Sequence, residues 1–319
     1  MFLPEIKSLP HEDISILFKL DNHSPNYIVD CGDASGLTVK ECQNTEAVFI
    51  SHTHIDHFIN FDQILRHQIG IEKRVVIVGP KDIHLQVQAK IRGYSWNLIK
   101  PGAIVYEIRE IISESEIQVY ELEPPVWTLK PTHTIQTNNN PVYENERFKV
   151  SFTLLDHKLP MVAYLFKEAD SVKINLEQAG FRGGAWVRVL KQAFEAGQND
   201  QAIVVEGKSY RAEALYHLLE VKAGDSLGVI MDHAANEANH QKIKKLFTAC
   251  HRVFIECFYK TEEKELAALN YHSYAQASGR IMHACRVKSA VPVHFSRKYG
   301  AKDIEQIVAD FYAEAKWAK

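Results

Sequence analysis

The stretch SHTHIDHFINF, residues 51–61, places His52, His54, Asp56 and His57 within six positions. It follows AVFIS, a short apolar run that predicts a buried strand. Ligands at the carboxyl end of a strand are positioned by a rigid element and remain open to solvent. Imidazoles suit zinc and related divalent metals, and the carboxylate adds charge that favours a second ion. One stretch cannot complete two coordination spheres, so we expect further ligands downstream.

Three later apolar runs also end in histidine or aspartate. SFTLLDHKLP carries Asp156 and His157, SLGVIMDHA carries Asp232 and His233, and SAVPVHFS carries His294. A single histidine after a strand is usually a solvated or hydrogen-bonded residue. Three repetitions of the arrangement downstream of an HxHxDH stretch favour metal ligands instead.

The composition is that of an ordinary globular protein. The 319 residues are 46% hydrophobic and 24% charged, which allows one large domain or two smaller ones. The net charge of −3 gives no general attraction for nucleic acid or acidic membranes. The N-terminal stretch lacks the pattern of a signal peptide, and no stretch approaches the roughly 20 apolar residues of a membrane span. Five scattered cysteines without CxxC spacing are typical of reduced thiols. We expect a cytoplasmic protein with no membrane contact.

The distribution of apolar residues predicts strands in the first half of the chain and alternating strands and helices in the second half. Strands are expected at residues 13–20, 26–32, 47–54, 74–80, 148–157 and 161–169, with further antiparallel strands between 103 and 134 and a helix at 81–94. In the second half, strands are expected at 201–210, 226–234, 251–259 and 289–296, and helices at 211–222, 239–249, 262–269, 273–285 and 301–318. Many strands in the first half, followed by alternating strands and helices in the second, predict two sheets covered by helices, which is an α+β fold.

Residues 168–200 fit this pattern poorly. Gly180, Gly183, Gly184 and Gly197 surround a partly helical stretch. Long insertions of this kind are usually functional arms or lids. The alternative is an ordinary surface helix with loose connections.

Taken in order, these motifs resemble the metallo-β-lactamase fold superfamily and, within it, the ribonuclease Z branch of 3′-tRNA-processing endonucleases. YIVDCGDA resembles that branch's DCGEG stretch, FISHTHIDH its THxHxDH stretch, and VPVHFSRKY its THFSxRY stretch. GDSLGVIMDHA stands where the branch has GDT, and IECFY and HSYAQASGRIMHA stand where it has HEATF and HSTAxxAAxxA. The resemblance implies a four-layer αβ/βα sandwich of two mixed sheets with outer helices. It would form a single domain over 1–319, with an arm at about 168–200.

The resemblance also implies a dinuclear zinc site with two Zn²⁺ per chain, although Mn²⁺ or Fe would suit the same ligands. One ion would be held by His52, His54 and His157. The other would be held by Asp56, His57 and His294, with Asp232 bridging the two. Two cations lower the pKa of a shared water and neutralise charge on a pentacoordinate phosphate.

Three residues carry implied catalytic roles. Asp56 would also orient the attacking water or take its proton. His272 resembles the branch's catalytic histidine and would stabilise the phosphate or protonate the leaving oxygen. Glu256 would hold His272 in one tautomer. The alternative for His272 is a helix cap beside Ser273.

The implied activity is endonucleolytic removal of 3′ trailers from precursor tRNA by a homodimer. The arm would grip RNA through Arg182, Arg188 and Lys191, although Glu177 and Glu195 dilute this basic character. In the HFSRKY stretch, Ser296 and Lys298 are the candidate substrate contacts. Two alternatives remain open: a hydrolase acting on a small phosphodiester or other small substrate, and a non-catalytic RNA-binding relative.

The chain departs from the branch at several positions. His233 follows the bridging aspartate, Ile255 stands where the branch has a histidine, and Ile55 replaces a glycine. DQILRHQ replaces a Gly-Leu-Pro-Gly helix start. Tyr94 and Trp96 have no counterpart and either fill the core or stack on bases. These departures leave the metal chemistry intact and bear on the substrate.

Overall fold

The computed structural model describes residues 1–137, 141–175 and 180–316. The chain divides into two compact units. The larger comprises Met1–Lys167 and Ser226–Lys319, and the smaller is Glu168–Asp225. The smaller unit begins where the predicted arm of residues 168–200 begins, but it extends beyond that arm to Asp225. Within the described residues, the structure has no helix that is long and apolar enough to cross a membrane.

The larger unit contains an eight-stranded sheet whose strands follow chain order. They are β1 (Phe2–Ile6), β2 (Ser15–Leu20), β3 (Asn26–Cys31), β4 (Thr45–Phe49), β5 (Arg74–Pro80), β6 (Val105–Ser113), β7 (Glu116–Leu122) and β8 (Lys130–Gln136). Strands β3 to β6 are parallel, and the strands on either side of them pair antiparallel. The sequence did not predict β1, because Pro4 interrupts its pattern. Proline is tolerated here because β1 is an edge strand.

A six-stranded sheet forms the second layer of strands, in the order β18-β17-β16-β11-β10-β9. Its strands are β9 (Tyr143–Glu144), β10 (Phe148–Asp156), β11 (Pro160–Glu168), β16 (Ser226–Ile230), β17 (Arg252–Glu256) and β18 (Ser289–Val293). Strands β16, β17 and β18 are parallel, and β11 pairs antiparallel with β16. Both sheets are therefore mixed, and the carboxyl ends of three parallel strands meet at one edge.

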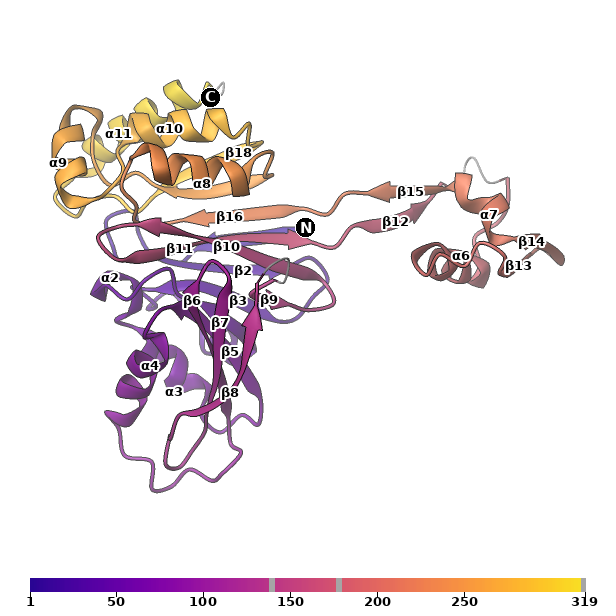
Figure 1. Ribbon diagram of the computed structural model, residues 1–319, viewed down its shortest axis with the longest axis horizontal. Coiled ribbons are helices and arrows are strands. Elements are labelled where there is room, and N and C mark those ends of the chain that lie inside the picture. The colour runs from indigo at the N-terminus through magenta and orange to yellow at the C-terminus, as the bar shows by residue number, and fades with distance from the viewer. Residues whose placement is uncertain (138–140, 176–179, 317–319) are drawn as a thin grey trace. The chain divides into compact units, whose positions relative to one another are not determined.

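Helices cover the outer faces of the two sheets (Figure 1). The first group consists of α1 (Val39–Asn44), α2 (Ile55–Phe58), α3 (Phe61–Gln68) and α4 (Ile83–Arg92). The second consists of α8 (Glu237–Phe247), α9 (Lys264–Asn270), α10 (Ala275–Ala284) and α11 (Ala301–Ala315). Alternate residues of a strand face opposite sides: Ile16 and Phe18 join the core between the sheets, whereas Leu17 joins the core under α3 and α4. The expected four-layer α+β sandwich is confirmed.

The smaller unit has its own apolar core, centred on Trp186, Leu190 and Ile203. Its elements are β12 (Ser171–Ile174), α6 (Ala185–Glu195), β13 (Ala202–Val205), β14 (Lys208–Arg211), α7 (Ala212–Leu215), a 3₁₀ turn (Tyr216–Leu218) and β15 (Leu219–Lys222). Strand β12 pairs with β15, and β13 pairs with β14. Glu177 lies outside the described residues.

Two predicted elements in the smaller unit are wrong. The strand predicted at 201–210 is a hairpin, because Glu206 and Gly207 adopt positive φ angles of 49° and 82° that suit a two-residue turn. The helix predicted at 211–222 stops at Leu215 and ends in a strand. Its last residues, LEVK, alternate in polarity and pair with β12, and this pairing overrides the helical spacing.

A buried charge cluster fixes the start of α1 to the first sheet. Thr38 and Glu41 form a reciprocal capping box. The Glu41 carboxylate also lies 3.1 Å from Lys7 Nζ and 3.3 Å from Lys19 Nζ. Burial raises the pKa of Glu41, but the Thr38 N–H and the two ammonium groups outweigh it and lower the pKa to about 2, from 4.5.

We predict that Glu41→Gln lowers the free energy of unfolding by about 1–2 kcal/mol at neutral pH. The folded-state pKa lies below the unfolded value, so the charge stabilises the fold above pH 4.5, and this contribution is lost as pH falls toward 2. Urea unfolding at neutral pH and at about pH 3 measures the difference. Glu146→Gln, at an exposed carboxylate, is the control. An equal deficit at both pH values would exclude a charge effect.

Candidate metal centre

The seven predicted ligand side chains lie together at the ends of strands from both sheets. They are His52, His54, Asp56, His57, His157, Asp232 and His294. They form two groups that share Asp232, and the candidate ligand atoms within each group lie within 4.8 Å of one another. The spacing HxHxDH brings four of them to one turn because β4 ends at Phe49 and the short α2 begins at Ile55.

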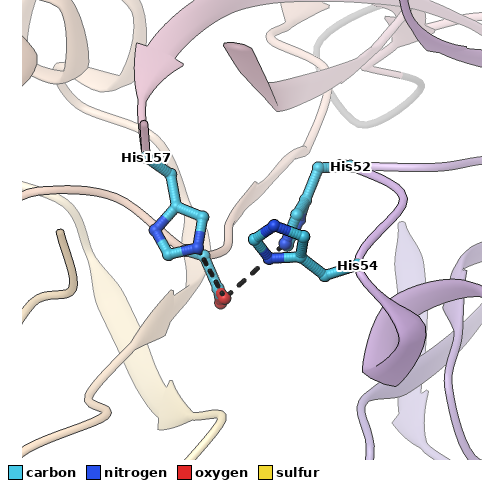
Figure 2. Close-up of side chains that lie close together, drawn as sticks. His52, His54 and His157 are labelled. Carbon is cyan, nitrogen blue, oxygen red and sulfur yellow. Dashed lines mark ion pairs between the residues drawn. The ribbon is translucent and has the colours of Figure 1, made fainter. Parts of the chain in front are cut away.

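The first group consists of His52, His54 and His157 around one oxygen of Asp232. Figure 2 shows the three imidazoles converging on a carboxylate. His52 Nε2 lies 3.7 Å and His157 Nε2 3.6 Å from Asp232 Oδ2. These separations leave room for a cation between nitrogen and oxygen atoms, since a zinc ion sits about 2 Å from each such ligand.

The second group uses the other oxygen of Asp232. His57 Nε2 lies 3.5 Å and His294 Nδ1 2.9 Å from Asp232 Oδ1. Asp56 completes the group, with its Oδ2 atom 3.4 Å from His294 Nε2. The two oxygens of Asp232 thus face different sets of imidazoles, which is the arrangement that a bridging carboxylate needs.

The bonding of these side chains fits a metal site. The imidazole nitrogens His52 Nε2 and His57 Nε2 are buried and have no hydrogen-bond partner among the described residues. Each unpartnered buried polar atom costs about 1–3 kcal/mol, so these nitrogens call for a compensating ligand. Imidazole nitrogens with carboxylate oxygens are a donor set suited to divalent zinc.

Burial and charge keep two of the donors, His52 and Asp232, in the protonation states that a cation requires. Burial lowers the pKa of His52 well below its ordinary value, so its imidazole is neutral. Burial raises the pKa of Asp232, but the His294 and His57 imidazoles outweigh burial and hold it well below its usual range. A neutral imidazole and an ionised carboxylate are the forms that bind metal. Burial lowers the pKa of His57 and His294, but the neighbouring carboxylates outweigh burial and raise it, so these two rings must lose a proton when a cation binds.

Known proteins resemble this chain over most of its length, although no family model matches it. Ribonuclease Z of Deinococcus radiodurans is 24% identical over 288 residues, 88% of this chain and 85% of that protein. Ribonuclease Z of Borreliella burgdorferi is 26% identical over 307 residues, 93% of this chain and 84% of that protein. The structure of the short form of human tRNase Z superposes with a TM-score of 0.57 at 14% identity and covers 94% of each chain. A metallo-β-lactamase fold protein from Bacillus subtilis gives 0.55 at 12% identity, covering 95% of this chain and 85% of its own.

The chain has the metallo-β-lactamase fold. Its sequence is ribonuclease Z-like, as the motifs predicted. Together with the His/Asp cluster, these relatives support a metal-dependent hydrolase.

A residue that the motif analysis missed, Asp30 at the end of β3, contacts the candidate ligand His57. The Asp30 carboxylate accepts hydrogen bonds from the Ser51 N–H and the Ser51 hydroxyl, both at 2.7 Å. It also lies 2.8 Å from His57 Nδ1 and thereby fixes the orientation of that ring. Asp30 is fully buried. Asp30 lies in the DCGDA stretch, where its position directly after an apolar run is the sequence signal for a residue at the site.

Gly32, two residues further on, allows the ligand loop to approach. A Cβ atom at this position would lie 1.9 Å from the Asp56 carbonyl oxygen. Only glycine therefore lets the end of β3 pack beneath the turn that carries Asp56 and His57. This requirement explains the glycine in DCG.

The predicted catalytic pair is also assembled beside the metal centre. The His272 Nδ1 atom is hydrogen-bonded to the Glu256 carboxylate, and the His272 ring stacks on Phe258 at 3.9 Å. Burial raises the pKa of Glu256, yet the charge on His272 lowers it overall; burial lowers the pKa of His272, yet Glu256 raises it. His272 does not cap α10, whose N-cap residue is Tyr274.

The departures from the family pattern lie outside both ligand groups. His233 is buried, with Nδ1 2.8 Å from the Met231 carbonyl oxygen and 3.3 Å from the Glu256 carboxylate, and it belongs to neither ligand group. Ile255 is fully buried in the core. Ile55 is 71% exposed on α2, next to the ligand turn.

The predicted substrate contacts differ in their availability. Lys298 lies 2.5 Å from Glu263 and over the rings of Tyr259 and Tyr299, so its charge is already paired. Ser296 is buried, 8% exposed. The three basic residues of the arm, Arg182, Arg188 and Lys191, lie in the smaller unit.

We predict that Asp30→Asn weakens metal binding about 10–100-fold, because His57 loses the acceptor that orients it. Competition with a chromogenic chelator measures the affinity. Asp21→Asn, at an exposed carboxylate, is the control and should bind metal normally. Unchanged affinity in a folded Asp30→Asn protein would show that Asp30 supports only the local backbone.

Proposed function

We propose that the chain is a ribonuclease Z-like endoribonuclease that removes 3′ trailers from precursor tRNA with two zinc ions. The observation that carries the proposal is the shared Asp232, whose two oxygens face separate imidazole groups. Similarity to ribonucleases Z over 88–93% of the chain supports the substrate class. Mn²⁺ or Fe would fit the same ligands, so zinc is part of the proposal.

When bound, two such cations lower the pKa of a shared water and neutralise charge on the phosphate. The chain's own residues then divide the remaining work. Asp56, whose side chain is 32% exposed, orients the incoming water or accepts its proton. As water attacks phosphorus, the bond to the 3′ oxygen of the tRNA breaks, and that oxygen needs a proton. His272 supplies it through Nε2, because Nδ1 is engaged by Glu256.

The smaller unit is the proposed RNA-gripping arm. Helix α6 buries Trp186 and Leu190 and carries Arg188 and Lys191 on the opposite side. These two residues and Arg182 form no ion pair within the described parts of the chain, so they are available to phosphates. Three cations give a modest electrostatic grip, with a correspondingly shallow dependence of affinity on salt.

A homodimer and a cytoplasmic location complete the proposal. Two copies would allow the arm of one subunit to reach RNA held by the other. All five cysteines are buried and free, which fits a reducing compartment. Sedimentation of the purified protein tests the dimer.

A second candidate function is hydrolysis of a small phosphodiester or another small substrate. The charge balance of the smaller unit favours it, since Arg211 is already paired with Asp200 and Glu213. The third possibility is a non-catalytic RNA-binding relative. The close grouping of all seven candidate ligands argues against it.

We predict precise trailer removal from a precursor tRNA by zinc-loaded protein with about two metal ions per chain. His54→Ala should reduce cleavage by about 100-fold or more, because the first ligand group loses an imidazole. His133→Ala, at an exposed histidine of β8, is the matched control. Gel analysis of the RNA and hydrolysis of bis(p-nitrophenyl) phosphate are measured together. Cleavage of the small diester alone would favour the second candidate, and two bound metals without turnover of either would favour the third.

We predict that Glu256→Gln and His272→Ala each lower kcat by about 100-fold or more without loss of metal, because they act in proton transfer. The double variant should lose little more than His272→Ala alone, since the two residues work as one unit. Steady-state kinetics with metal analysis measures this, and Glu305→Gln on α11 is the control. Additive losses would mean that Glu256 does not act through His272.

A further inference from the structure

A cavity of about 480 Å³ opens on the larger unit beside α3. One wall is the face of α3 that carries Asp62, Leu65, Arg66 and Ile69, and the other wall is the loop of residues 94–99. None of these residues belongs to the ligand groups of the metal centre. The cavity is therefore a separate feature.

The loop presents a firmly held aromatic surface. Trp96 donates a 2.7 Å hydrogen bond from Nε1 to the Ile91 carbonyl oxygen and packs against the buried Trp127. Tyr94 in turn lies edge-to-face on Trp96, with ring centroids 6.1 Å apart, and is 52% exposed. Trp96 thus helps to close the core, whereas Tyr94 offers a ring to a ligand.

Two exposed arginines line hollows that also include this ring. Arg66 lines the cavity, Arg92 lines an adjoining hollow that also includes Tyr94, and Lys100 follows the loop. All three are exposed and form no ion pair with any described residue. The acid in the cavity, Asp62, is paired with Lys90 at 3.3 Å. Its Oδ1 atom is buried, and the charge of Asp62 raises the pKa of the nearby Tyr94 hydroxyl.

We propose that this cavity binds a base of single-stranded RNA beyond the scissile phosphate. Tyr94 stacks on the base, and Arg66 contacts the adjoining phosphate. An exposed aromatic ring among free cations is the combination that single-stranded nucleic acid requires. The proposal rests on the proposed function, because it assigns a place to part of that substrate.

The chain connects the cavity directly to the metal centre. Asp56 lies on α2 and Arg66 on α3, the next helix along the chain, and only Ile59 and Asn60 separate the two helices. Ile55, which begins α2, and Ile59, which follows its last residue, are 71% and 41% exposed. A strand that leaves the metal centre along α2 would cross an apolar surface before it reaches the cavity.

The test compares two RNA hairpins with the same stem and single-stranded 3′ trailers of about two and about ten nucleotides. Tyr94→Ala should raise KM for the long trailer by about 5–50-fold, and by more than for the short one. Tyr94→Phe keeps the ring and should retain the preference for the long trailer. Arg66→Ala should reduce the salt dependence of binding by about one charge. Lys302→Ala, which removes an exposed cation of α11, should change neither RNA.

Equal changes in KM for both hairpins would overturn the proposal. So would an unchanged KM accompanied by loss of self-association, because the cavity would then be an interface between copies. Binding of a labelled decaadenylate by anisotropy separates this inference from the proposed function. If the wild-type protein cleaves neither these hairpins nor a precursor tRNA, the proposed tRNA processing is contradicted. Weaker decaadenylate binding by Tyr94→Ala than by Tyr94→Phe then supports the cavity, and equal binding rejects it.

Discussion

The carboxylate of Asp232 is the point on which the site depends. It is almost completely buried, and its charge is balanced by imidazoles on both sides. A buried carboxylate in this position is tolerable only when cations or hydrogen-bond donors surround both oxygens. Two sets of histidines surround this carboxylate. Asp30 orients His57 in one of these sets, and Gly32 allows the turn that carries His57 to pack against the end of β3.

The parts of the site that depend on residue type and strand ends could be predicted from the sequence. Histidines follow the carboxyl ends of β4, β10 and β18, strands of two different sheets, and the apolar runs in the sequence identify those ends. The pairing of Glu256 with His272 was available only through the resemblance, since sixteen residues and a helix separate them.

Other features depend on contacts that a one-dimensional pattern does not contain. Asp30 matters because the Ser51 backbone and His57 reach it from 21 and 27 residues away. The hairpin at Glu206 and Gly207 depends on two positive φ angles within an apparently continuous strand pattern. The free face of Tyr94 exists because its neighbour Trp96 turns inward onto Trp127. In each case tertiary packing selects one of two local structures that the sequence pattern alone predicts equally well.

The candidate ligands come from both sheets of the sandwich. His52, His54 and His57 follow a strand of the eight-stranded sheet, whereas His157, Asp232 and His294 follow strands of the six-stranded sheet. A cation bound by members of both sets would link the two sheets. The sheets could then separate only if the metal dissociated, so bound metal would lower the rate of unfolding.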